Sequence, residues 1–170
     1  MEQEAPIQMA RRHDSLIPLA RDHYDGLLLA VRLQQGTRAL ERLWSHDPLW
    51  QADYIVKFYE EHLRQHFRAE EEALFPLAAA HVEEARTIVN ELLSQHRLME
   101  EYVHRFRSPD PETLESHLRE FGKLLEGHIR KEDRGLFPLF EEKASPSVLA
   151  DAEKSISKFY PSSANPLMKH

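Results

Sequence analysis

Two segments of the chain repeat a pattern of histidine and glutamate that suits metal binding. The first begins at His66 and reads HFRAEEEALFPL, and the second begins at His128 and reads HIRKEDRGLFPL. In each copy a glutamate follows the histidine by four residues, Glu70 in the first and Glu132 in the second. Because residues four apart share a face of an α-helix, each copy presents an imidazole and a carboxylate together. A metal cation would bind both groups of such a pair.

The face that carries each pair is otherwise apolar. In the second expected helix it includes Ile55, Tyr59 and Leu74, and in the fourth it includes Leu118, Phe121, Leu125 and Leu136. Burial of an unpaired carboxylate is very costly, so polar groups on an apolar face need partners. The pattern therefore predicts that both pairs point into the protein interior and meet a cation there.

Two further histidines lie in similar apolar settings, one on each of the other two expected helices. A single histidine of this kind is usually a hydrogen-bonded core residue, so the prediction depends on the agreement among four helices. Imidazole with carboxylate suits iron or manganese, and two carboxylates can bridge metals about 3.5–4 Å apart. The predicted ligands are His23, His66, Glu70, His96, His128 and Glu132.

Helix-breaking and capping residues divide the chain into helical blocks that would carry these ligands. Asp14 or Ser15 could cap a first helix that runs to Trp44, and Asp47 with Pro48 begins a second that Pro76 kinks or ends. The third block covers roughly 82–106. Asp110 and Pro111 begin the fourth, which runs to Pro138 or slightly beyond. Gly127 lies inside it, and we expect a neighbouring helix to approach closely there. Ser145 and Pro146 start a short last helix.

These blocks predict an all-α protein, an up-down-up-down four-helix bundle with a short extra C-terminal helix. We expect a flexible leader at 1–12, the bundle at 13–145, the short helix at 146–160 and a disordered tail at 161–170.

Composition narrows the class of protein. The net charge is −7 and the basic residues are scattered, which argues against a nucleic-acid partner. Cysteine is absent, which excludes disulfides and iron–sulfur ligation by this sequence. The sequence has no run of eighteen apolar residues and therefore no predicted membrane span. We expect a cytoplasmic protein without a membrane partner.

Over roughly 13–141 the sequence resembles the hemerythrin-like, or HHE cation-binding, family. The resemblance rests on the two repeated segments, on DHYDGLL around His23 and on SQHRLME around His96. It implies a non-haem centre of two iron ions with an oxo or hydroxo bridge. In that centre the four histidines are terminal ligands, and Glu70 and Glu132 are bridging ligands.

The sequence departs from the oxygen-carrying members of the family. Those proteins have a fifth histidine in a His-x3-His pair on the third helix, whereas here Glu100 follows His96 by four residues. The chain is more similar to the branch with four histidines and two glutamates, in which one iron is more open. The family's usual spacing on the fourth helix makes Asp133 a rival to Glu132. Besides Asp133, two residues are candidates for an additional ligand or a hydrogen-bond partner of a ligand: His62 and Glu100.

These features lead to competing functional hypotheses. The first is a diiron protein that binds or senses O₂, NO or peroxide, or takes part in iron homeostasis. The alternative is a diiron oxidoreductase that consumes peroxide or NO, and a metal-free helical module is a third. A ferritin-like centre needs Glu-x-x-His on two helices, and the relevant pairing occurs once, at Glu101 and His104. The sequence leaves catalysis and the oligomeric state open.

Overall fold

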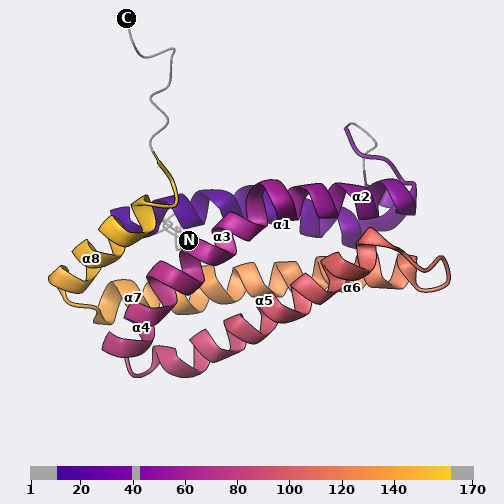
Figure 1. The fold of residues 1–170 in the computed structure, drawn as a ribbon. Coiled ribbons are helices and arrows are strands. Elements are labelled where there is room, and N and C mark those ends of the chain that lie inside the picture. The colour runs from indigo at the N-terminus through magenta and orange to yellow at the C-terminus, as the bar shows by residue number, and fades with distance from the viewer. Residues whose placement is uncertain (1–10, 40–42, 162–170) are drawn as a thin grey trace, which may run out of the picture.

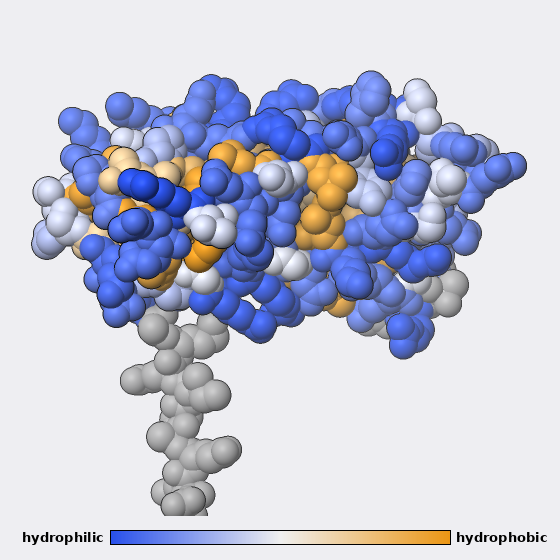
Figure 2. Space-filling model, turned by 90° about the horizontal axis from the view of Figure 1, so that it is seen from below, coloured by the Kyte–Doolittle hydropathy of each residue, from blue (hydrophilic) through white to orange (hydrophobic). Residues whose placement is uncertain are grey.

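The computed structural model describes residues 11–39 and 43–161, and regular structure in this part of the chain is entirely helical (Figure 1). The predicted leader and tail lie almost wholly outside the described residues. Among the described residues, no helix combines the length and the apolar character needed to cross a bilayer. The face shown in Figure 2 is mostly hydrophilic, with apolar side chains gathered in a few groups.

The first helical segment is shorter than predicted. It comprises a 3₁₀ turn η1 (Asp14–Leu16), helix α1 (Ile17–Gln35) and a 3₁₀ turn η2 (Gly36–Arg38). The predicted cap at Asp14 or Ser15 is wrong, because the side chain of His13 accepts the backbone N–H of Ser15. The predicted extension to Trp44 is also wrong. Gly36 has φ 57°, a conformation that glycine adopts easily and that ends the helix.

The second segment is one long run of helix that contains two π-helical turns. Its parts are α2 (Pro48–Phe58), η3 (Tyr59–Leu63), α3 (Arg64–Ala69), η4 (Glu70–Leu74) and α4 (Phe75–His81). As predicted, Asp47 caps its start by accepting the N–H of Leu49. The helix does not end at Pro76. In the wider turn before it, the N–H of Phe75 donates to the carbonyl of Glu70, and the helix continues to His81.

The third and fourth segments follow, and the fourth contains the second copy of the repeat. They comprise α5 (Ala85–Arg107), α6 (Leu114–Lys131), the π-helical turn η5 (Glu132–Leu136) and α7 (Phe137–Lys143). The predicted start at Pro111 is wrong, since the Asp110 carboxylate accepts the N–H of Glu112 and forms a turn ahead of the helix. In η5 the N–H of Phe137 donates to the carbonyl of Glu132, as in the first copy.

The last helix, α8 (Pro146–Ser157), begins as predicted and ends three residues early. Ser145 accepts the N–H of Val148 and caps it. Val148, Ala152 and Ile156 are buried on one face. This face packs against η1 and η4, so α8 covers one end of the long segments (Figure 1).

Helices α1 and α6 pack closely along their length, and two glycines permit the contact. A Cβ atom at Gly122 would lie 2.8 Å from Cβ of Leu33, and one at Gly26 would lie 2.8 Å from Cδ1 of Ile129. The prediction that Gly127 marks the close approach is wrong, because a Cβ atom at Gly127 would meet no atom of a neighbouring helix within 4 Å. Positions five residues apart differ by about 140° around the helix axis. Gly127 therefore faces away from the helix that Gly122 meets.

The apolar core consists of two separate clusters. One contains Leu19, Leu74, Leu92 and Leu136, and the other contains Leu29, Phe67, Met99 and Leu125, each with further neighbours. The chain passes from the first cluster to the second along α1 and α5. It passes from the second to the first along the two segments that contain the repeats. In each of the four segments the predicted histidine ligand lies at or next to the boundary between the clusters.

Candidate metal centre

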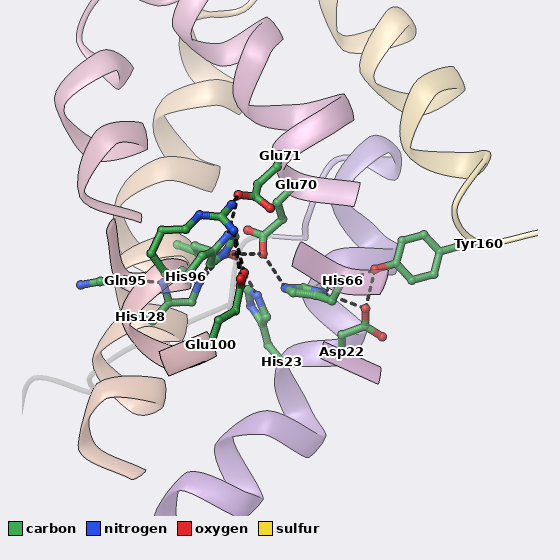
Figure 3. Close-up of polar contacts among 12 residues, drawn as sticks. Asp22, His23, His66, Glu70, Glu71, Gln95, His96, Glu100, His128 and Tyr160 are labelled. Atoms are coloured by element: carbon green, nitrogen blue, oxygen red, sulfur yellow. Dashed lines mark hydrogen bonds and ion pairs between the residues drawn. The ribbon is translucent and has the colours of Figure 1, made fainter. Parts of the chain in front are cut away.

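All six predicted ligands meet in the interior, one histidine from each long segment. Figure 3 labels the four histidines and Glu70. Their ligand atoms form two groups, and within each group the atoms lie within 4.8 Å of one another. One group contains His23, His66 and Glu132, and the other contains Glu70, His96, His128 and Glu132. The side chains of all six are buried, and both glutamates are 0% exposed. Glu132 is the member common to both groups.

Each glutamate begins a π-helical turn. Glu70 is the first residue of η4 and Glu132 is the first residue of η5, and each carbonyl accepts an N–H from five residues ahead. Such wide turns occur often at functional sites, because they place one extra residue in a helical turn. The repeat in the sequence is therefore also a repeat in backbone geometry, and it presents two carboxylates to the centre from matching backbone positions.

The imidazoles of all four histidines present their Nε2 atoms inward. His66 Nε2 lies 2.8 Å from Glu70 Oε1, and His128 Nε2 lies 2.6 Å from Glu132 Oε1. The other oxygen of Glu132 is 3.0 Å from His23 Nε2. His96 Nε2 lies 3.2 Å from His128 Nε2 and 3.5 Å from Glu70 Oε1. Nitrogen and oxygen donors thus converge on one small volume.

The outward Nδ1 atoms of three histidines have close polar partners. Nδ1 of His23 lies 2.7 Å from Asp133 Oδ1, and Nδ1 of His66 lies 2.8 Å from Asp22 Oδ2. For His128 the partner is Oε1 of Gln95, at 2.8 Å. An acceptor at Nδ1 keeps the proton there and leaves the Nε2 lone pair free for a metal.

The fourth histidine has a looser partner. His96 Nδ1 lies 3.8 Å from Glu71 Oε1, beyond hydrogen-bond distance, and Glu71 forms an ion pair with Arg97. The four outer partners then follow one rule, since each is the chain neighbour of another ligand. The neighbouring pairs are Asp22–His23, Glu70–Glu71, Gln95–His96 and Glu132–Asp133. Every long segment supplies a ligand and, beside it, the partner of a histidine on the next segment around a closed ring.

Asp22 and Gln95 were not predicted from the sequence. The prediction considered residues on the same helical face as the ligands, whereas an adjacent residue points about 100° away from that face. A polar residue directly beside each ligand is the signal that could have identified them. Tyr160 was also missed, because it lies after the last helix and its hydroxyl donates to Asp22.

Several buried polar atoms at the centre have no hydrogen-bond partner within the described residues. They include both carboxylate oxygens of Glu70 and Oε1 of Glu132. The contacts of Glu70 with His66 and of Glu132 with His128 are close N···O approaches that are not hydrogen bonds. Buried carboxylate oxygens without partners are costly, and a cation between them would bind both. The donor set therefore fits a metal.

Without a cation, the two glutamates differ in electrostatics. Burial, together with the nearby carboxylate of Glu132, raises the pKa of Glu70 well above its usual value. Burial tends to raise the pKa of Glu132, but its contacts with His128, Glu70 and His23 together outweigh burial and hold that pKa well below the usual value. For His23, hydrogen bonds to Asp133 and Glu132 overcome burial and raise the pKa to about 9. In the metal-free centre the raised pKa values favour the protonated forms of Glu70 and His23.

The remaining candidates lie outside the centre. Asp133 is 35% exposed and contacts His23 from outside, whereas the Glu132 side chain is 0% exposed and lies between the histidines. The exposed His62 packs its ring against Phe58, with the ring centroids 5.3 Å apart. The carboxylate of Glu100 binds Arg97 at 2.9 Å. None of the three belongs to either group of ligand atoms found among the described residues.

Comparison with known proteins identifies the family. The model of the hemerythrin HHE cation binding domain matches residues 28–140. The matched segment includes five of the six clustered residues and begins just after the sixth, His23. Searches of curated proteins and of solved structures found no match. Because the matched segment covers most of the chain, the chain belongs to the hemerythrin HHE cation-binding domain family.

Proposed function

We propose that the chain is a non-haem diiron protein built on an up-down-up-down four-helix bundle, with α8 as an added helix. The two apolar clusters support this topology, because successive segments pass between them in opposite directions. The proposed iron ligands are the six buried residues: His23, His66, Glu70, His96, His128 and Glu132. Four imidazoles with two carboxylates suit iron better than magnesium or calcium, which prefer oxygen donors.

The composition of the two ligand groups supports one metal in each. Glu132 belongs to both groups, so its two oxygens could serve two metals at once. Glu70 lies next to His66 in one direction and to His96 in the other, at 2.8 and 3.5 Å. Glu132 would then contact both metals, Glu70 would hold the metal of the second group, and each pair of histidines would hold one metal from outside. Bound iron ions would supply redox chemistry and a coordination position for a small molecule.

We propose that the function is to bind or sense a small molecule such as O₂, NO or peroxide, or to handle iron. The observation that carries this proposal is the inequality of the two groups. The group of His23 and His66 has three protein ligands, whereas the other has four. A metal with fewer protein ligands retains a position for an exogenous ligand. Because all six side chains are buried, only a small molecule would fit beside them.

Metal analysis combined with optical spectroscopy tests this proposal. After iron-replete expression we expect about two iron ions per chain, as in other two-metal sites. Absorption bands of the oxidised centre should bleach with dithionite, and the reduced protein should change its spectrum on exposure to O₂ or NO. The metal should be lost near pH 4, since imidazole must be neutral to coordinate. A chain that stays metal-free would contradict the proposal.

Turnover separates binding or sensing from catalysis. Peroxide or NO is added to the reduced protein with an excess of reductant, and its consumption is followed. Consumption that stops after one equivalent per centre supports binding or sensing. Sustained consumption that Glu132→Gln abolishes would instead assign the chain as a diiron oxidoreductase.

A further inference from the structure

The segment after α8 lies against the part of the chain that carries His66. The side chain of Gln65 donates to the carbonyl of Phe159, and the guanidinium of Arg68 lies 5.7 Å from the centroid of the Phe159 ring. Gln65 and Arg68 lie on either side of His66 in sequence. The end of the described chain therefore packs against the helical segment that carries His66.

Tyr160 extends this attachment to the centre itself (Figure 3). Its hydroxyl donates to Oδ2 of Asp22 at 2.5 Å, and the same oxygen lies 2.8 Å from Nδ1 of His66. The hydroxyl is also 3.4 Å from that nitrogen. Burial and the Asp22 carboxylate raise the pKa of Tyr160, so the hydroxyl keeps its proton. Asp22 thus lies between a tyrosine O–H and an imidazole N–H.

This arrangement distinguishes Asp22 from the other outer partners. Asp133 contacts His23 from a position 35% exposed to solvent. Glu71 is paired with Arg97 of α5, which belongs to the same four segments as the ligands. Tyr160 comes from beyond them, and it also lies beyond residue 140, where the match to the family ends. The buried face of α8 is what carries it there.

We propose that Tyr160 is a positioning residue of the metal centre and that α8, which carries it, belongs functionally to the site. By holding the Asp22 carboxylate, Tyr160 fixes the proton on Nδ1 of His66 and keeps Nε2 directed at the metal. This inference rests on the proposed function, because it assigns His66 as a ligand. It adds a residue from outside the family domain to the control of one of the two metals.

Tyr160→Phe tests the inference, because it removes only the hydroxyl. Tyr102→Phe is the matched control, since Tyr102 also donates to a carboxylate, Glu120 at 2.8 Å, away from the centre. Both variants are loaded with Zn²⁺, which is diamagnetic, and the imidazole nitrogens are observed by ¹⁵N NMR. Release of Zn²⁺ to a chelator is followed in parallel.

In Tyr160→Phe we expect the His66 ring signals to shift while those of His23, His96 and His128 stay in place. One of the two Zn²⁺ ions should leave faster, by about 3–10-fold, somewhat less than the effect of losing a direct partner of a ligand. Tyr102→Phe should match the wild type. Asp22→Ala should change the same His66 signals more strongly, and the double variant should equal Asp22→Ala, because Tyr160 acts through Asp22.

Two results would overturn the inference. One is Tyr160→Phe with unchanged His66 signals and unchanged release of both ions. The other is a double variant whose effect is the sum of the single ones, which would make the role of Tyr160 independent of Asp22. Wild-type protein that binds no metal would defeat the proposed function instead. The His66 signals of the metal-free chain then decide, and they must still respond to Tyr160→Phe alone.

Discussion

The two copies of the repeat share their local structure and differ in their surroundings. Both place a histidine four residues before a buried glutamate, and both continue into a π-helical turn before a proline. Yet burial and Glu132 raise the pKa of Glu70, whereas contacts with His128 and its neighbours together outweigh burial at Glu132 and keep the pKa of Glu132 low. Glu132 lies within 3.0 Å of two histidines, His23 and His128. Neither oxygen of Glu70 has a hydrogen-bond partner within the described residues.

The outer partners differ in the same way. The first copy's histidine, His66, is held by a carboxylate, Asp22, which Tyr160 also contacts. The second copy's histidine, His128, is held by a neutral amide, Gln95. The comparison teaches that a repeated sequence can set the backbone and the inward direction of a ligand. The electrostatics of that ligand come from the segments packed against it.

The largest expected effect comes from neutralising the two glutamates. Glu132→Gln should empty both metal positions, because Glu132 contributes to both ligand groups. The loss of affinity should exceed the roughly 10–100-fold that follows removal of an outer partner. Glu70→Gln should weaken mainly the metal held by His96 and His128. Elemental analysis after dialysis against a graded series of chelator concentrations measures both.

The same two variants should also differ in the free energy of unfolding of the metal-free chain. Glu132→Gln removes the buried one of the two carboxylates that contact protonated His23. Removal of one partner of a buried pair costs about 3–5 kcal/mol, and Asp133 remains to lower that cost. Glu70→Gln should cost far less, since the raised pKa of Glu70 already favours its neutral form. Denaturant unfolding in chelator gives both values. Equal losses of stability would show that the two carboxylates are electrostatically equivalent.

The stability of the metal-free chain should fall as pH rises from about 6.5 to about 9. His23 has a folded-state pKa of about 9, above its unfolded value of 6.5, so its contribution is complete below 6.5 and lost through this window. The loss should reach about 3 kcal/mol. The pKa of Glu70 is also raised, so its contribution to stability is likewise lost as pH rises, starting from a lower pH. The pKa of Glu132 is lowered, so its contribution is lost as pH falls. Unfolding at a series of pH values measures the slope, and Asp133→Asn should reduce it.

Removing an outer partner should have a smaller effect than removing a ligand. Gln95→Ala leaves Nδ1 of His128 without its acceptor, and the affinity for one metal should drop about 10-fold. Asp133→Asn should leave both metals in place, because an amide oxygen can still accept from His23. Competition with a chelator of known affinity measures both variants. Loss of the centre in Asp133→Asn would make Asp133 a bridging ligand in place of Glu132.

The smallest expected effect concerns a glycine that occurs in one copy only. Gly127 precedes His128, whereas Gln65 precedes His66. Gly127→Ala should raise the free energy of unfolding by about 0.5–1 kcal/mol, since the position is helical and open. Metal content should not change. As a control, Gly122→Ala should destabilise the chain, because its Cβ would meet Leu33 at 2.8 Å.

The sequence by itself determined the elements and the inward-facing residues. Helical periodicity places His66 with Glu70 and His128 with Glu132 on apolar faces, and this information is local. It also indicated the cap at Asp47 and the start of the last helix at Ser145. It did not predict the π-helical turns, because the hydrogen-bond shift from four to five residues depends on packing as well as on the following proline.

Only the tertiary structure decided how the repeat is used. Asp133 and Glu132 are adjacent acidic residues, and their roles differ because α1 places His23 between them. The partnership of Asp22 with His66 and Tyr160 joins residues from three distant parts of the chain. Likewise, the approach of α1 selects Gly122 rather than Gly127 as the required glycine. These features depend on which segments are neighbours and at what rotation, and a single helix's periodicity carries no such information.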